Sequence, residues 1–255
     1  MKFGCVNRTD DLSIKIEKEI IRKLEDKGHS FDNNNPDYVF SIGGDGTFIK
    51  AVNKYLDNGI IFININTGSF GYLCEFEINE IDELINNIEK YNSKEYSLLE
   101  LNLNNLEKIY AVNEFRIHSR HGKTLSFDIY INDTFLESLR GDGVIISSSI
   151  GSSGVSRSLG GALIDNEIEM LQIVEEAPIL NFKYGSLHSS FVLNKDKHIT
   201  LKNFSYAFHI FYDSSDRLIN DYDVSLDIKL SSKKIKILKN PKTNYIEKTS
   251  KLFTR

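Results

Sequence analysis

The first third of the chain alternates short apolar runs with stretches of helical period, and this alternation constrains the fold more than any other feature. Ile60 to Ile65 is nearly all isoleucine and phenylalanine, a composition typical of a strand that is buried on both faces. Met1 to Val6 and Tyr38 to Ile42 are shorter strands. Between them, Leu12 to Lys27 repeats its apolar residues at helical spacing. Strand–helix repetition of this kind predicts a parallel sheet covered by helices.

The period of the apolar pattern changes to two from about residue 97. Leu125 to Ile131, Tyr206 to Tyr212 and Val224 to Leu230 alternate apolar with polar residues, as half-buried antiparallel strands do. Leu159 to Leu163 is the one piece that could be helical. We therefore expect a β-rich second half without a long helix.

These patterns predict two domains. The first is a Rossmann-like α/β domain, residues 1–96, and the second is a β-rich domain, residues 97–234. The linker-like stretch at the boundary is Asn92 to Lys94. We expect the polar tail, residues 235–255, to pack back on the first domain rather than fray.

Composition narrows the classes of function. A net charge of −5 provides no basic footprint for nucleic acid. No run of 18 apolar residues occurs, so we expect no membrane span, and the N-terminus does not resemble a secretory signal. Cys5 and Cys74 stand far apart, which favours two inert thiols in a reducing compartment. We predict a cytoplasmic enzyme.

The segment Gly43 to Thr47, Gly-Gly-Asp-Gly-Thr, follows a strand and opens a helix. Glycines let the backbone approach a ligand closely, and the free N–H groups at a helix start attract phosphate. A carboxylate among phosphates is electrostatically unfavourable unless it holds a metal or takes a proton from an attacking hydroxyl. Asp45 is therefore a candidate general base. A plain Asp-Gly turn is the alternative, and the lack of Gly-Lys-Ser/Thr excludes a Walker A loop.

Four segments in order resemble motifs of the NAD kinase family. Gly43–Thr47 is similar to a loop that this family shares with lipid kinases and, more loosely, with phosphofructokinases. Asn66–Leu73, Asn113–Glu114 and the stretch Arg140–Gly161 are similar to three further motifs of NAD kinases. The resemblance implies an NAD kinase-like two-domain fold with a phosphofructokinase-type first domain. It also implies that the second domain, residues 97–234, binds NAD and carries the self-association.

The resemblance also implies an activity. NAD kinases transfer the γ-phosphoryl of ATP, or in some members of polyphosphate, to the adenosine ribose 2′-hydroxyl of NAD, which makes NADP. By this resemblance Asp45 is the catalytic base. The residues implied to bind substrate are Gly44, Gly46, Thr47, Lys50, Tyr72, Asn113, Glu114, Arg140, Asp142, Ser153, Gly154, Val155, Ser156, Ser158 and Ala177.

Within that set the resemblance implies distinct roles. Asn113 and Glu114 hold the dinucleotide, and Ser153 to Ser158 line its pocket. Asp142 and Ala177 reach the NAD of a neighbouring subunit in a homodimer or homotetramer. Lys50 and Arg140 are the nearby cations. We expect Mg²⁺ or Mn²⁺ to bind mainly through the ATP phosphates, because no cage of oxygen ligands is visible in the sequence.

The sequence departs from the family pattern at two places. Val155 stands where an aromatic residue is usual, and the later segment Asn181 to Ser190 matches only loosely. The first departure motivates an alternative, a catalytically weak protein that binds or senses NAD. A lipid kinase of the diacylglycerol type is the other alternative, since it shares the glycine loop.

Overall fold

The computed structural model describes residues 1–56, 59–69, 71–120, 122–181 and 185–254. Phe70 and Phe182, which belong to segments discussed above, lie outside these ranges. The chain forms two compact units: unit 1 comprises Met1–Tyr96 and Lys234–Arg255, and unit 2 comprises Ser97–Lys233. The division falls inside two continuous strands, β6 (Ser93–Leu103) and β17 (Leu226–Leu238). Two of the three residues of the stretch Asn92 to Lys94, which the sequence indicated as linker-like, therefore belong to β6.

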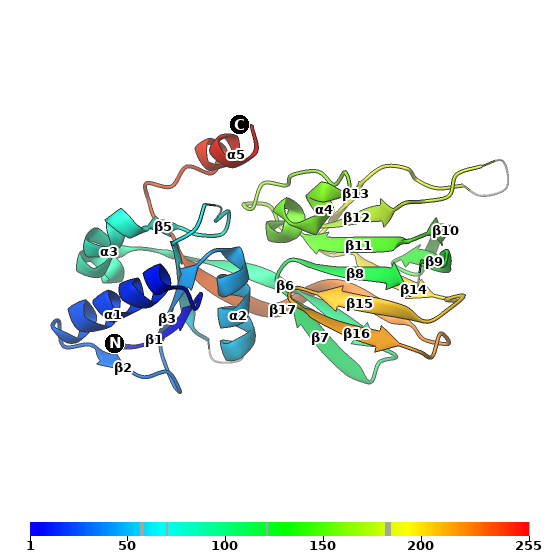
Figure 1. The fold of residues 1–255 in the computed structure, drawn as a ribbon. Helices are drawn as coiled ribbons and strands as arrows, with labels where there is room; N and C mark the ends of the chain where they lie inside the picture. Colours follow the sequence, from blue (N-terminus) through cyan, green and yellow to red (C-terminus); the bar gives the residue numbers. More distant parts are fainter. Residues whose placement is uncertain (57–58, 70, 121, 182–184, 255) are drawn as a thin grey trace. The chain divides into compact units, whose positions relative to one another are not determined.

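Unit 1 contains the predicted parallel sheet (Figure 1). Its strands are β1 (Lys2–Asn7), β2 (Ser30–Phe31), β3 (Tyr38–Gly43), β4 (Ile61–Asn66) and β5 (Phe76–Glu77). The order β4-β3-β1-β2 is parallel throughout, and β5 pairs with the end of β4. The last residues of β17 pair with the start of β4, also in parallel. All these strands therefore end at one edge, where ligands of parallel α/β sheets bind.

Helices cover both faces of this sheet (Figure 1). They are α1 (Asp11–Glu25), α2 (Asp45–Tyr55) and α3 (Ile81–Asn87), with short 3₁₀ turns at Ile78–Glu80 and Ile88–Lys90. The C-terminal helix α5 (Tyr245–Phe253) instead contacts Tyr72, in the segment after β4. The apolar repeat predicted within Leu12 to Lys27 forms the buried side of α1, at Ile16, Ile20 and Leu24. The same core includes the apolar side of α3. Phe48 of α2 packs edge-on against Phe62 of β4, with ring centroids 5.8 Å apart. The helix positions follow from the period of the sequence.

Unit 2 is built from two sheets that enclose one apolar core. In one sheet the order is β10-β9-β14-β17, with β6 and β7 beyond β17, and in the other it is β13-β12-β11-β8-β15-β16. The remaining elements of the unit are β7 (Glu107–Ala111), β8 (Glu114–Ser119), β9 (Leu125–Ile131), β10 (Thr134–Gly141), β11 (Gly143–Ser148), a 3₁₀ turn (Ile150–Ser153), α4 (Val155–Ser158), β12 (Met170–Glu176), β13 (Phe191–Asn194), β14 (His198–Lys202), β15 (Phe208–Tyr212) and β16 (Ser215–Ile219). The expected fold class is thereby confirmed.

The one helical piece predicted in this half was misplaced. Residues 159–163 are not helical, and the short helix α4 ends at Ser158. Gly160 adopts a φ of 89°, a conformation that ends a helix readily because glycine has no side chain to obstruct it. Gly161 then passes so close to Ser156 that an added Cβ would lie 2.7 Å from its carbonyl oxygen. The glycine pair turns the chain back toward the sheet.

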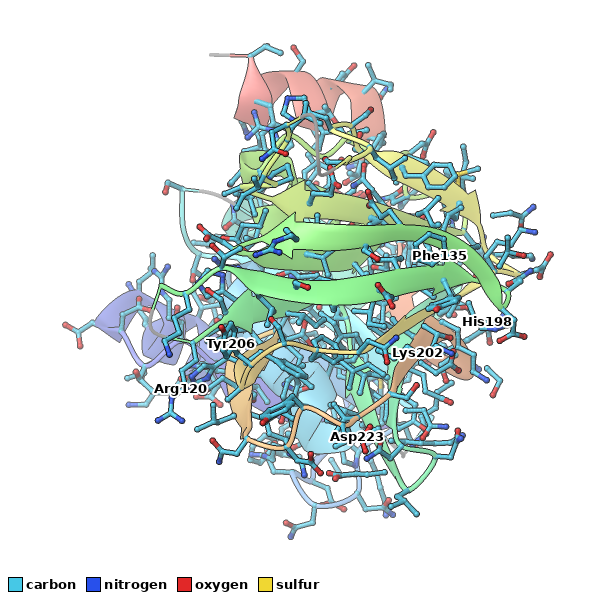
Figure 2. All side chains as sticks on the ribbon, turned by 90° about the vertical axis from the view of Figure 1, so that its right-hand side faces the viewer. Arg120, Phe135, His198, Lys202, Tyr206 and Asp223 are labelled. Carbon is cyan, nitrogen blue, oxygen red and sulfur yellow. The ribbon has the colours of Figure 1, made fainter. Side chains whose placement is uncertain are left out.

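The outer strands of unit 2 carry aromatic and cation–π contacts at the surface. The ring of Tyr130 on β9 is flanked by Phe135, at a centroid distance of 5.6 Å, and by the Lys202 ammonium, 4.3 Å from its centroid. Phe135 and Lys202 are labelled in Figure 2. In the part of the chain that the structure describes, no helix is both long and apolar enough to cross a membrane.

Candidate active site

The glycine segment lies at the junction of β3 and α2. Gly43, the last residue of β3, pairs with Asn66, the last residue of β4. Gly44 precedes α2, and among the described residues no side chain caps that helix. The Thr47 N–H donates to the Gly44 carbonyl oxygen at 2.9 Å, so the N–H of Gly46 is the one available to an anion in this first turn. A Cβ added to Gly46 would meet no described atom within 4 Å. The segment therefore presents an open helix N-terminus of the kind that binds phosphate.

Asp45, the first residue of α2, turns its carboxylate toward the Asn66–Leu73 segment. Its Oδ1 accepts the N–H of Leu73 at 2.8 Å and its Oδ2 accepts the N–H of Tyr72 at 3.1 Å. Burial raises the pKa of Asp45, and these two amides together with the Lys248 ammonium oppose that rise. A carboxylate offers about four lone-pair positions, so two amides leave room for a substrate hydroxyl.

The sequence did not indicate the cation that acts on Asp45. Lys248 belongs to α5, and its Nζ donates a hydrogen bond to the Cys74 carbonyl oxygen, next to the segment that holds Asp45. Lys50, which the family resemblance implied as a nearby cation, is an exposed residue of α2. No short-range pattern links position 248 to the glycine segment. The i, i+4 spacing of Tyr245 and Thr249 could only have indicated a helix with one packing face.

A second group of predicted residues meets in unit 2, at the start of β8. The Asp213 carboxylate accepts the N–H of Asn113 at 2.9 Å and that of the preceding residue at 2.8 Å. The backbone of Gly151 lies directly against that of Asn113: a Cβ added to Gly151 would be 1.9 Å from the Asn113 carbonyl oxygen. A Cβ on Gly154 would lie 3.0 Å from Glu114 Oε2. The Asn113–Glu114 pair and the glycine–serine stretch are thus direct neighbours.

Glu114 and Asn113 each bury an oxygen that accepts no hydrogen bond from the described residues, Oε2 of the one and Oδ1 of the other. Burial raises the pKa of Glu114 to about 8, the nearby Asp213 adds to the rise, and Arg116 opposes it. At neutral pH the Glu114 carboxyl is therefore mostly protonated, and can both donate and accept a hydrogen bond. Buried polar groups usually have partners, and these two oxygens are therefore candidates to accept or share hydrogen bonds with a ligand.

The predicted pocket-lining residues differ in their exposure. Val155 is 42% exposed and Ser158 is also exposed, whereas Ser153 and Gly154 are half-buried. Ser156 is fully buried, and its Oγ accepts a hydrogen bond from Gln172 Nε2 at 2.9 Å. Four of the five residues are therefore accessible from the surface of unit 2, and Ser156 holds the loop in place from inside.

Arg140, Asp142 and Ala177 come together at the opposite end of β11. Asp142 donates its N–H to the Glu176 carbonyl oxygen at 2.9 Å, and the Arg140 carbonyl oxygen accepts the N–H of Ile179 at 2.7 Å. Ala177 has a φ of 45°, a left-handed conformation that is uncommon for a residue other than glycine. Asp142 and Ala177 are both exposed.

The distance between the two groups in unit 2 is set by β11. Ser147, near one end of that strand, pairs with Glu114, and Asp142 immediately precedes the other end. At about 3.4 Å per residue, five residues of strand separate them by roughly 17 Å. Within one copy of the chain, Asp142 therefore lies far from the Asn113–Glu114 pair.

A parallel sheet with an open glycine segment, joined to a β-rich unit with buried polar groups, defines a nucleotide-binding protein of two units. Comparison with known proteins specifies it further. Residues 6–93 match the family model of the ATP-NAD kinase N-terminal domain, and residues 112–240 match that of the ATP-NAD kinase C-terminal domain.

Individual proteins that are similar to this chain belong to the same family as the matching models. The chain is 36% identical to an NAD kinase of Lactobacillus gasseri, over 88% of this chain and 83% of that protein. It is 30% identical to NAD kinase 2 of Listeria monocytogenes, over 98% and 97%. Among solved structures, its fold is similar to an NAD kinase from Archaeoglobus fulgidus in complex with ATP (TM-score 0.83, 21% identity, all of both chains). It is also similar to yeast NADH kinase complexed with NADH (TM-score 0.88, 16% identity, 100% of this chain and 87% of that one).

The chain belongs to the NAD kinase family, and it is an enzyme with NAD kinase activity. This assignment confirms the predicted family and decides against the lipid kinase alternative.

Proposed function

We propose that the chain transfers the γ-phosphoryl of ATP, or of polyphosphate, to the adenosine ribose 2′-hydroxyl of NAD, with Asp45 as the general base. The observation that carries this proposal is the Asp45 carboxylate, which two consecutive amides hold at the start of α2 beside an open helix N-terminus. The Archaeoglobus relative was solved with ATP and the yeast relative with NADH, which supports a nucleotide donor and a dinucleotide acceptor.

The role of the loop follows from the chemistry of phosphoryl transfer. The transition state is loose, so positioning and charge stabilisation account for most of the catalysis. The N–H group of Gly46 at the start of α2 would bind the donor phosphates, with Gly44 allowing their close approach. Thr47 would help to shape the loop, since its N–H donates to the Gly44 carbonyl oxygen at 2.9 Å. Asp45 would orient the ribose hydroxyl and accept its proton, and Tyr72 would supply one of the amides that hold the base.

The polar groups of unit 2 are suited to the dinucleotide. A protonated Glu114 and the Asn113 side chain would form hydrogen bonds with adenosine, whose hydroxyl groups both donate and accept and whose amino group donates. Ser153, Gly154, Val155 and Ser158 would line the pocket, while Ser156 would keep the loop in shape. Val155 provides apolar contact where the family resemblance implies an aromatic ring, so we expect binding with less stacking energy.

We also propose self-association, as a homodimer or homotetramer. Asp142 and Ala177 are exposed and lie roughly 17 Å along β11 from the Asn113–Glu114 pair, so they are better placed to reach the NAD of a neighbouring copy than that of their own. Arg140 holds this corner through its backbone. The strained conformation of Ala177 is of the type that clusters at functional sites.

A divalent cation, Mg²⁺ or Mn²⁺, would be carried mainly by the donor phosphates. Both Asp45 oxygens already accept backbone amides, and the described His, Cys, Asp and Glu side chains form no group of three or more that could hold a metal ion. When bound, the cation would neutralise charge on the phosphates. The thiols of Cys5 and Cys74 are both buried and unpaired, which is compatible with the cytoplasmic location that we propose.

Replacing Asp45 tests the proposal. We expect Asp45→Asn to lower kcat by about 10²–10⁴-fold, because an amide cannot accept the hydroxyl proton, and to leave the Kd for NAD within about twofold. A coupled assay of NADP formation and calorimetric titration with NAD measure the two effects.

The matched control is Asp11→Asn, which changes an exposed aspartate in the first turn of α1. It should behave as the wild type in both measurements. An Asp45→Asn protein that folds normally and turns over at the wild-type rate would refute the role of Asp45.

A further inference from the structure

The C-terminal tail of the chain holds the segment that follows the glycine-rich site. Lys239 forms an ion pair with Glu75, and Asn240 Nδ2 and Thr243 Oγ1 both donate to the Glu75 carbonyl oxygen, at 3.2 and 3.1 Å. One residue earlier, the Cys74 carbonyl oxygen accepts a hydrogen bond from Lys248 Nζ. Four tail side chains therefore contact two consecutive residues of unit 1.

Helix α5 covers the same segment with aromatic side chains. The ring of Tyr72 lies between those of Tyr245 and Phe253, at centroid distances of 5.7 and 5.3 Å. Its hydroxyl lies 3.4 Å from Thr249 Oγ1. Tyr72 is buried, at 3% exposure. Packed aromatic contacts of this kind each contribute about 1 kcal/mol beyond area burial, so the helix fixes the position of Tyr72.

These contacts lead directly to the candidate base. The N–H groups of Tyr72 and Leu73 hold the two oxygens of Asp45, and Lys248 binds the next carbonyl along the chain. The Lys248 side chain is also largely removed from water, since burial lowers its pKa. A desolvated ammonium acts on a nearby carboxylate more strongly than one in water does.

We propose that Lys248 is a positioning residue for the phosphoryl transfer: through its hydrogen bond to the Cys74 carbonyl oxygen it holds the Tyr72–Cys74 segment against Asp45, and its positive charge adds to the amides that favour the carboxylate form. The inference rests on the proposed role of Asp45 as the base. It makes the C-terminal helix part of the active site, although the helix contributes no motif of its own.

Other charged groups near this pair must be considered. Asp45 has the Cys74 thiol beside it, and Lys248 is influenced by Glu75, Cys74, Asp45 and Lys239. Glu75 is already paired with Lys239, so Lys248 is the cation left to act on Asp45 within this cluster. Removing the Lys248 charge should therefore raise the pKa of Asp45, because the lysine is the group that lowers it through its charge.

The test compares Lys248→Met and Lys248→Arg with the control Lys251→Met, an exposed lysine of the same helix. We expect Lys248→Met to lower kcat at pH 6 about tenfold or more and to leave KM for NAD within about twofold. The acid limb of the kcat profile should move to higher pH, since the base form of Asp45 is lost earlier on acidification. Lys248→Arg should keep the wild-type acid limb, and Lys251→Met should match the wild type throughout.

A purely structural role for Lys248 would lower kcat equally at all pH values, and that result would overturn the proposal, as would a wild-type profile for Lys248→Met. Should Lys248→Met fail to fold, Lys248→Gln, which retains a hydrogen-bond donor without the charge, must show the same shift of the acid limb. Failure of the proposed function is distinguishable, because it would appear as full turnover of Asp45→Asn whatever the Lys248 variants do.

Discussion

Glu114 is only 7% exposed and lies beside a second carboxylate, Asp213, at the start of β8. Its pKa is raised from the ordinary 4.5 to about 8, so the folded protein keeps a proton that the unfolded chain releases. Between these two pH values, a rise in pH favours unfolding. Above pH 8 the Glu114 carboxyl is ionised in both the folded and the unfolded state. The loss of unfolding free energy caused by its burial then no longer changes with pH.

The variant Glu114→Gln removes this pH-dependent loss of unfolding free energy, because an amide does not titrate. From pH 4.5 to 8, we expect the wild type to lose on the order of 4 kcal/mol of unfolding free energy relative to the variant. Urea unfolding at several pH values measures the difference. Glu107→Gln, an exposed position in the same unit, should follow the wild-type curve, and parallel curves for wild type and Glu114→Gln would contradict the prediction.

At the scale of elements, two glycines of similar appearance in the sequence have opposite surroundings. A Cβ on Gly46 meets open space at the start of α2, whereas one on Gly151 would lie 1.9 Å from the Asn113 carbonyl oxygen. We expect Gly46→Ala to preserve stability, or to raise it by up to about 1 kcal/mol through helix propensity. The same change should raise KM for the phosphoryl donor about tenfold, since the methyl group stands where phosphates approach the backbone.

Gly151→Ala should do the reverse. We expect it to lower the free energy of unfolding by about 3 kcal/mol, because the β7–β8 junction must move to admit the methyl group. Calorimetric unfolding and steady-state kinetics on both variants check this separation. A Gly46→Ala protein with unchanged donor kinetics would argue against phosphate binding at that helix.

Elements with a clear period were predictable from the sequence, and those that depend on distant contacts were not. Ile16, Ile20 and Leu24 marked the buried side of α1 because one helix period suffices to define it. Leu159 to Leu163, which the sequence left as a possible helical piece, is not helical, because the turn there depends on how Gly161 packs against Ser156. The glycine segment was found by its local composition. Lys248 was not, because it acts on Asp45 only when the fold brings it to Cys74, 174 positions earlier in the chain.

On the scale of the whole molecule, the placement of Asp142 predicts that subunits share active sites. If Asp142 serves a neighbouring copy, a mixed pair of Asp45→Asn and Asp142→Ala subunits contains one site with both residues intact. When the two variants are mixed at random, half of the pairs contain one subunit of each kind, and one of the two sites in such a pair is intact. We therefore expect about a quarter of wild-type activity, although each variant alone is nearly inactive. Co-expression, followed by the NADP-formation assay, measures it.

Each parent mixed only with itself should stay inactive, and sedimentation should confirm that the mixed species has the wild-type oligomeric mass. If mixing restores no activity although mixed oligomers form, each copy uses its own Asp142.

The strand that completes the sheet of unit 1 comes from the far end of β17, where Lys236 and Ile237 pair with Ile61 and Phe62. During synthesis, the ribosome must therefore release all of unit 2 before the nascent first unit can close its edge at β4. Until then that edge stays open to other chains, a known hazard of unpaired strands. For this protein, translation speed and chaperone contact during the second half of the message should matter more than they would for a domain made in one continuous stretch.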